Sequence, residues 1–117
     1  MKVLVYRKCS TCMKALKWLD EHNINYEERA IKEENPTYEE LKEWYTKSGL
    51  PLKKFFNTSG MLYKEMGLKD KLKDMSEDEQ LKLLATDGML VKRPLVIGDD
   101  FVLTGFREKE WSEAMHM

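Results

Sequence analysis

The chain opens with MKVLVYRKCSTC, residues 1–12, and this stretch decides the fold. Its first six residues are apolar, aromatic or β-branched apart from Lys2, which is typical of a short, mostly buried strand. From Ser10 to about Asn23 apolar residues recur at helical spacing, which predicts an amphipathic helix. The apolar face of that helix comprises Cys12, Ala15, Leu16 and Leu19. The pair Cys9-Ser-Thr-Cys12 is therefore expected where a strand turns into a helix.

A second strand is predicted at residues 26–31, after a helix stop at Asn23-Ile-Asn25. Polar residues interrupt its apolar pattern, which favours a position near the edge of a sheet. Two strands joined by one helix form a β-α-β unit, in which the strands run parallel and the crossover is right-handed. Residues 1–31 thus predict an α/β fold.

About residues 36–90 are predicted to form an all-helical insertion. Thr37 with Glu40, and Ser76 with Glu79, have the spacing of capping boxes, which mark the starts of two helices. Shorter helical pieces are expected at residues 53–56, 61–66 and 69–74. A single crossover helix needs far fewer residues than lie between the second and third strands, so the insertion is an addition to the β-α-β unit.

The chain is expected to finish with a hairpin and a helix. Arg93-Pro94-Leu-Val-Ile-Gly98 predicts a strand that opens with proline, where a missing ladder donor is tolerated. Asp99-Asp100 predicts the turn, and Phe101-Val-Leu103 the returning strand. The last helix is expected from Glu108. At 117 residues, with no repeat or linker, the chain is predicted to be a single domain.

Charge and hydropathy exclude several classes of function. Lysine and arginine total 20 against 21 aspartates and glutamates, a net charge of −1, so no broad basic field exists to hold nucleic acid or an anionic membrane. No stretch approaches the roughly 18 apolar residues of a spanning helix, and Arg7 and Lys8 stand where a signal peptide would have its apolar core. We expect a cytoplasmic protein with no direct contact to nucleic acid or membranes.

Cys9 and Cys12 are the only cysteines in the chain. In a reducing compartment such a pair is more often catalytic, redox-sensing or metal-binding than a structural disulfide. Unsatisfied N–H groups and the positive end of the dipole at a helix start favour a thiolate at Cys9. We predict that Cys9 attacks and that Cys12, one turn later, resolves the mixed disulfide. Arg7 and Lys8 add positive charge if their side chains turn toward Cys9.

Two other interpretations of the cysteines stay open. A structural zinc site needs four ligands, and the remaining candidates, His22 and His116, lack the close spacing of a zinc finger. His22, near a helix end, is better explained as a partner of the helix dipole. Cys12 alone fits an inert core cysteine, since free cysteine is among the most buried residue types.

The Arg93-Pro94 pair is a second candidate feature. A proline that opens a strand is either cis or trans, and in a fold of this order the preceding backbone faces the cysteine turn. Arg93 then brings a guanidinium toward the sulfur of Cys9 or toward an anionic group on its substrate. A solvated arginine before a strand is an equally good explanation from sequence alone.

Taken together, these features resemble the arsenate reductase-like (ArsC/Spx) family, which has an α/β, thioredoxin-like fold. The matching features are the strand that leads into Cys9-Ser-Thr-Cys12, the helix with Lys14-Ala-Leu-Lys-Trp-Leu19, the helical insertion, and Arg93-Pro94-Leu-Val-Ile97 before a hairpin and a last helix. They cover nearly the whole chain. The combination of the cysteine pair with a late Arg-Pro strand is more specific than the pair alone.

The resemblance implies that Cys9 is the reactive cysteine and that Arg93 binds an oxyanion. Arsenate reductases of this family surround the anion with three arginines. At the second of these positions this chain has Ser59, and the third falls near Gly105, two residues before Arg107. One arginine supplies less electrostatic complementarity for a doubly charged oxyanion than three, so arsenate reduction is not favoured.

The function that the resemblance implies is that of a cytosolic, thiol-dependent oxidoreductase. Its expected substrate-binding residues are Ser10, Thr11, Ser59, Pro94 and Arg107. No bound cofactor or metal is expected, because the sequence has no Gly-rich phosphate loop or ligand cluster. The expected reductant is glutathione or a protein thiol, such as that of a thioredoxin-like protein. The alternative is an Spx-like redox-sensing transcriptional regulator that binds RNA polymerase, since that branch also carries a CxxC pair.

Overall fold

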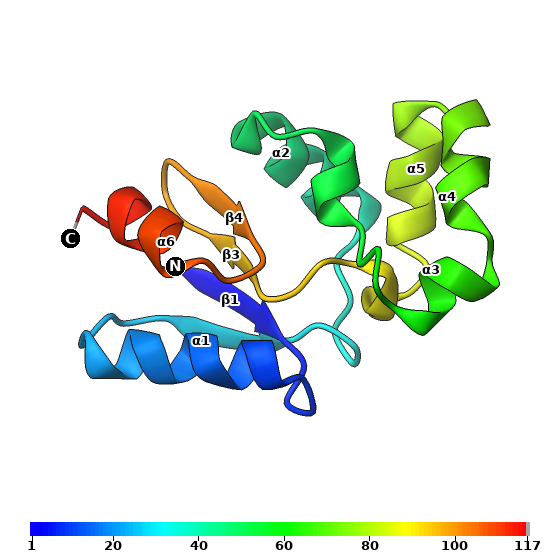
Figure 1. Ribbon diagram of the computed structural model, residues 1–117. Helices are drawn as coiled ribbons and strands as arrows, with labels where there is room; N and C mark the ends of the chain where they lie inside the picture. Colours follow the sequence, from blue (N-terminus) through cyan, green and yellow to red (C-terminus); the bar gives the residue numbers. More distant parts are fainter. Residues whose placement is uncertain (117) are drawn as a thin grey trace.

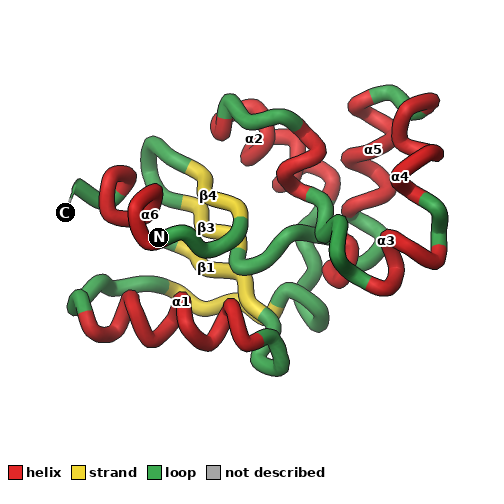
Figure 2. The backbone as a smooth tube through the Cα atoms, in the orientation of Figure 1, coloured by secondary structure: helices red, strands yellow, loops and turns green. Residues whose placement is uncertain are grey.

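The computed structural model describes residues 1–116 and contains a four-stranded sheet of order β2-β1-β3-β4 (Figures 1 and 2). Its strands are β1 (Lys2–Val5), β2 (Glu27–Ala30), β3 (Leu95–Ile97) and β4 (Val102–Thr104). β1 pairs in parallel with β2 and antiparallel with β3, and β3 forms an antiparallel hairpin with β4. The polar strand β2 lies at the edge, as its sequence predicted.

The sheet separates two helical layers (Figure 1). These are α1 (Ser10–Glu21) with α6 (Glu108–Ala114) on one face, and α2 (Tyr38–Ser48) on the other. Successive strand residues point to opposite faces, so Val3 and Val5 pack with the α1 layer and Leu4 packs with the α2 layer. Trp18 and Trp111 meet edge to face, with ring centroids 5.8 Å apart, and so join α1 to α6.

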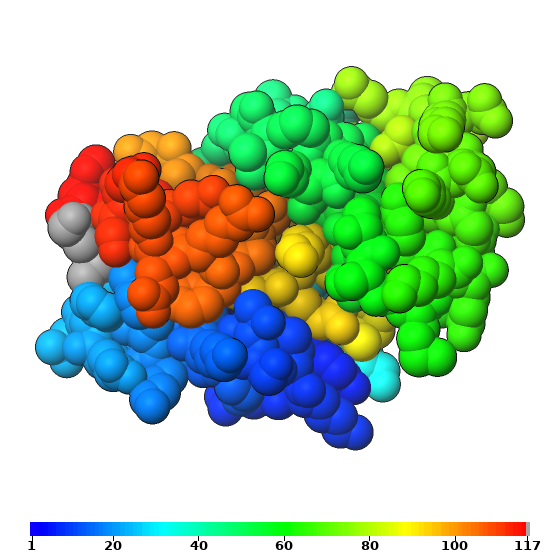
Figure 3. Space-filling view, in the orientation of Figure 1, coloured from blue at the N-terminus to red at the C-terminus, as the bar shows by residue number. Residues whose placement is uncertain are grey.

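The insertion continues after α2 as a series of short helices. They are 3-10 turn η1 (Leu52–Phe55), α3 (Met61–Glu65), α4 (Leu68–Lys71), η2 (Leu72–Asp74), α5 (Glu77–Leu84) and η3 (Gly88–Leu90). Both predicted capping boxes form, at Thr37 with Glu40 and at Ser76 with Glu79. In Figure 3 the insertion, in green, lies at one end of the molecule, and the C-terminal segment, in orange and red, lies at the other.

The predicted fold class is confirmed, and the hairpin shows where the predicted boundaries were wrong. β3 begins at Leu95, directly after Pro94, and β4 begins at Val102, one residue later than expected. Phe101 belongs to the turn, because its carbonyl accepts a hydrogen bond from the N–H of Gly98 at 2.9 Å. A Cβ on Gly98 would lie 2.3 Å from the Phe101 ring, so only glycine fits beneath that ring.

Gly88 lies after α5, where the insertion approaches the chain that follows β2. The helix already ends at Leu84, with Ala85 as its C-cap. A Cβ on Gly88 would lie 1.8 Å from the carbonyl oxygen of Ile31, so this glycine allows the insertion to approach the chain that follows β2. No helix within residues 1–116 is long and apolar enough to cross a bilayer.

Candidate active site

The candidate catalytic residues lie at one end of the sheet because β1 and β3 run in opposite directions. Leu4 pairs with Leu95, so the chain leaving β1 passes beside the chain entering β3. Cys9 lies on the first of these segments and Arg93 on the second. The peptide bond between Arg93 and Pro94 is cis, one of the two isomers that the sequence left open.

Cys9 is the N-cap residue of α1, as the position of the cysteine pair predicted. Its own N–H donates to the carbonyl of Tyr6 at 2.9 Å, and its thiol is partly exposed. Partial burial raises the pKa of this thiol, but the backbone N–H groups of Cys12 and Thr11, the Cys12 thiol and the charge of Arg93 together lower it below its ordinary value. Cys9 therefore has the character of an attacking thiol.

Cys12, one turn along α1, is fully buried. Burial, with a smaller effect of the nearby Cys9, raises the pKa of its thiol to about 12, against the effect of the Tyr6 N–H that donates to its sulfur at 3.5 Å. At neutral pH Cys12 thus keeps its proton. The two thiols differ as an attacking and a resolving cysteine should.

Arg93 is half-buried beside Cys9 and has few partners of its own. Its Cζ lies 5.3 Å from the centre of the Tyr6 ring. Its Nη1 donates to the carbonyl of Met89 over a long 3.4 Å, and its Nε is buried with no hydrogen-bond partner within residues 1–116. Buried N–H groups in proteins are nearly always paired, so this unpaired Nε sets Arg93 apart from an arginine that is fully used within the fold.

Arg7 does not contribute to the site in the way that the sequence left open. Its guanidinium forms a bidentate pair with Glu28 of β2, through Nε to Oε2 at 2.8 Å and through a second bond from Nη2 to Oε1. This pairing turns Arg7 toward the edge strand and neutralises its charge. The cation that lowers the pKa of Cys9 is instead Arg93, from the other end of the sequence.

Three of the expected substrate-binding residues lie around this centre. Ser10 and Thr11 are exposed in the first turn of α1, next to Cys9. Pro94 is buried, and its carbonyl accepts a hydrogen bond from the N–H of Gly105 at 2.9 Å. Residues that follow β4 are thereby tied to the segment that carries Arg93.

The structure shows no contact that brings Ser59 or Arg107 to the cysteines within the described residues. Ser59 is exposed in the turn before α3, where its hydroxyl donates to Asn57 Oδ1 at 3.4 Å. Arg107 is the N-cap residue of α6, with a largely exposed side chain 3.7 Å from Glu110. Both side chains are exposed, so neither is held in place by burial.

Within residues 1–116, no group of three or more histidine, cysteine, aspartate or glutamate side chains is placed to hold a metal ion. His22 instead caps the end of α1, with Nδ1 2.7 Å from the carbonyl oxygen of Trp18 and its ring stacked on the Trp18 indole. His116 is exposed near the end of the described chain.

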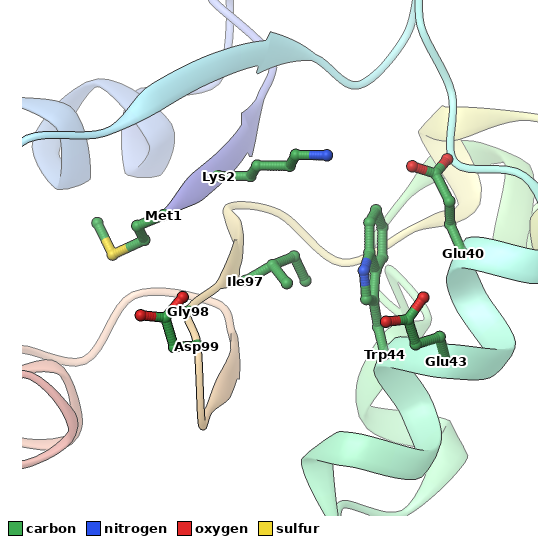
Figure 4. Close-up of a pocket in the computed structure, with 8 residues that line it drawn as sticks. All are labelled: Met1, Lys2, Glu40, Glu43, Trp44, Ile97, Gly98 and Asp99. Carbon is green, nitrogen blue, oxygen red and sulfur yellow. The ribbon is translucent and has the colours of Figure 1, made fainter.

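A separate groove of about 310 Å³ lies at the opposite end of the sheet from Cys9 (Figure 4). Lys2 and Ile97 line it from the strands, and Glu43 and Trp44 line it from α2. None of the reactive residues contributes to it. The chemistry of the site thus lies on an open surface at the helix start and not in the groove.

One residue of the site was missed by sequence reasoning. Tyr6 contacts Cys9 and Cys12 through its backbone and Arg93 through its ring. The sequence showed only an aromatic residue at the end of a strand, where core packing is the ordinary explanation. The antiparallel pairing of β1 with β3, which brings Arg93 to this ring, was not visible from the sequence.

Comparison with known proteins shows the family of this chain. The model of the ArsC family matches residues 4–114, which span both cysteines and Arg93. A protein of Bacillus subtilis named YusI is 59% identical over 108 residues, and the match covers 92% of each chain. A crystal structure of an ArsC family related protein from Bacteroides fragilis superposes with a TM-score of 0.93 at 59% identity, covering 96% of this chain and 94% of that one.

A more distant relative is named as a regulator. The global transcriptional regulator Spx 2 of Bacillus cereus is 26% identical over 102 residues, which cover 87% of this chain and 76% of the regulator.

Proposed function

This chain belongs to the ArsC family, and we propose that it acts as a thiol-dependent oxidoreductase whose reactive residue is Cys9. The observation that carries this proposal is the contrast between its two thiols. Cys9 is partly exposed with a lowered pKa, and Cys12, one helical turn away, is buried with a pKa of about 12. A static core pair would have no reason to differ in this way.

The proposed reaction is the reduction of a disulfide RS–SR′. The Cys9 thiolate attacks one sulfur, a new S–S bond forms, and R′S⁻ leaves with the electron pair of the broken bond. Cys12 then loses its proton to solvent and attacks Cys9 Sγ, which releases RS⁻ and leaves a Cys9–Cys12 disulfide. Two electrons have then passed from the protein to the substrate, and two external thiols return them by forming a disulfide of their own.

Arg93 and the backbone N–H groups of Thr11 and Cys12 stabilise negative charge during these steps. The thiolate of Cys9, the leaving thiolate and any carboxylate on the substrate are all anionic, and each gains from a preorganised donor. The external reductant is proposed to be glutathione or a thioredoxin-like protein thiol in the cytoplasm. No bound cofactor is needed, because thiols supply and accept both electrons.

Arsenate is not the proposed substrate. Ser59 and Gly105 occupy the positions at which the resemblance implies two further arginines. Arg107 is largely exposed beside Glu110, so the anion site would depend on Arg93 alone. A single guanidinium suits a thiolate or a carboxylate better than a doubly charged oxyanion.

The test is to trap the intermediate with Cys12→Ser, which leaves Cys9 without a resolving thiol. After exposure to oxidised glutathione or to cell extract, this variant should retain a disulfide-linked adduct that intact-mass spectrometry identifies. The matched control is Cys9→Ser, which should carry no adduct. Absence of any adduct on Cys12→Ser, or equal adducts on both variants, would contradict the proposal.

A second function, redox-sensing regulation through RNA polymerase, is favoured by the relationship to Spx 2. In that case the cysteine pair would report oxidation and would not turn over a substrate. Two measurements on the wild type separate the two functions, and multiple turnovers with glutathione support the enzyme. Co-purification of polymerase subunits that depends on the oxidation state of the pair supports the regulator.

A further inference from the structure

Tyr6 connects the members of the site to one another. Its carbonyl accepts a hydrogen bond from the N–H of Cys9 at 2.9 Å, and its own N–H donates to Cys12 Sγ at 3.5 Å. Its ring lies 5.3 Å from the Cζ of Arg93. The backbone contacts fix the cysteine turn whatever the side chain is, so only the ring contact depends on the identity of this residue.

Arg93 has little else to hold it. The bond from Nη1 to the Met89 carbonyl is long, at 3.4 Å, and Nε has no partner in the part of the chain that the structure describes. No salt bridge involves Arg93 within that part either. A guanidinium over an aromatic face is attracted to the ring quadrupole, and this attraction is larger at a partly desolvated position.

We propose that Tyr6 is a positioning residue, whose ring holds the Arg93 guanidinium where its charge acts on the Cys9 sulfur. This inference rests on the proposed function of the cysteine pair and adds a residue to it. The Tyr6 hydroxyl forms no hydrogen bond within residues 1–116, so the role belongs to the aromatic face and not to the phenol.

The other charged groups near this ring leave Arg93 as its main cation. Lys32 Nζ lies 6.0 Å from the ring centre, at the outer limit of such contacts, on an exposed side chain. Arg7 is paired with Glu28 and turned toward the edge strand.

The test compares Tyr6→Leu, which removes the ring, with the matched control Tyr6→Phe, which keeps it. Rates of Cys9 alkylation by iodoacetamide are measured against pH, a readout that needs no substrate. In Tyr6→Leu the apparent pKa of Cys9 should rise and alkylation at pH 7 should slow by up to about threefold, because the ring acts only through the charge of Arg93. Tyr6→Phe should match the wild type.

A merely structural role for Tyr6 is separated by a double-mutant cycle. If the ring acts through Arg93, adding Tyr6→Leu to Arg93→Ala should change the alkylation profile no further. Additive slowing in the double variant would overturn the inference. Should leucine prevent folding, Tyr6→Met supplies a second ringless side chain. In the folded wild type, the Arg93 Hε resonance in a ¹H–¹⁵N spectrum should be shifted by the ring current, and an unshifted resonance would also overturn it.

Failure of this inference is distinguishable from failure of the proposed function. A wild-type Cys9 with an ordinary pKa and no disulfide exchange overturns both. A lowered Cys9 pKa that is unchanged in Tyr6→Leu overturns the role of Tyr6 alone and leaves the oxidoreductase proposal standing.

Discussion

The two half-buried arginines Arg29 and Arg93 both lie over aromatic rings, yet their surroundings differ completely. Arg29, on β2, donates to both carboxylate oxygens of Glu40 at 2.7 and 2.9 Å. It also donates to the backbone carbonyls of Glu34 at 2.8 Å and Asn35 at 3.1 Å. All three side-chain nitrogens of Arg29 therefore donate hydrogen bonds within the fold.

Arg93 has no such set of partners. Its Nε is buried and unpaired, and no carboxylate within residues 1–116 forms a salt bridge with it. The contrast teaches that the partners of an arginine, and not its presence in the sequence, separate a structural arginine from a functional one. Arg29 joins the edge strand to α2, whereas the charge of Arg93 is not balanced by a carboxylate within residues 1–116 and helps to lower the pKa of Cys9.

The largest effect on stability is expected from Arg29→Met. The substitution leaves the carboxylate of Glu40 without its cation in a partly buried position, at a cost on the order of 2 kcal/mol. Chemical denaturation measures this loss. The matched control is Lys17→Met, which removes an exposed ion pair with Glu21 at 4.0 Å and should change stability by less than about 0.5 kcal/mol. Equal losses of stability in the two variants would show that the contacts of Arg29 do not stabilise the fold.

Lowering the pH should weaken the ion pair between Arg29 and Glu40. Hydrogen bonds from Arg29 lower the pKa of Glu40 from its usual 4.5 to about 2, against the effect of burial. A lowered pKa contributes stability that is complete above pH 4.5 and disappears as the pH falls toward 2. Allowing for solvent screening, this contribution is on the order of 1 kcal/mol. Between these pH values Glu40→Gln should therefore lose less stability than the wild type, and parallel curves would contradict this.

Arg93→Ala should change the stability of the fold little and the reactivity of Cys9 more. Stability should change by less than about 1 kcal/mol, because no salt bridge is broken and a buried unpaired N–H is removed. The pKa of Cys9 should rise, since the charge of Arg93 is one of the effects that lower it, and alkylation at pH 7 should slow about threefold. A marked loss of stability with unchanged Cys9 reactivity would make Arg93 a structural arginine like Arg29.

The sequence was sufficient where a local pattern determines the outcome. The cysteine pair at the start of a helix, the edge position of β2 and both capping boxes follow from residues within a few positions of each other. These features need no knowledge of distant contacts. The fold class could be predicted because this order of strands and helices is compatible with few topologies.

The parts that the sequence could not provide depend on residues far apart in the chain. The sequence left open whether Arg7 also assists Cys9, and only the contacts in space show that Arg7 is paired with Glu28. The close approach of Gly88 to Ile31, across more than fifty residues, has no local signal in the sequence. Electrostatic balance and close packing are properties of the assembled fold.

The smallest effect is expected from removing both thiols. Cys9 and Cys12 enclose only four residues, so a disulfide between them restricts the unfolded chain little. Cys12 is fully buried and behaves as a small apolar residue, which makes alanine the fitting replacement there. In Cys9→Ser/Cys12→Ala the far-UV circular dichroism should be unchanged and the melting temperature should lie within a few degrees of the reduced wild type. Disulfide exchange by the same sample should fall to the background rate. Unfolding of this variant, or of the reduced protein, would show that the cysteines hold the fold together, and the surroundings of Arg93 would then be as structural as those of Arg29.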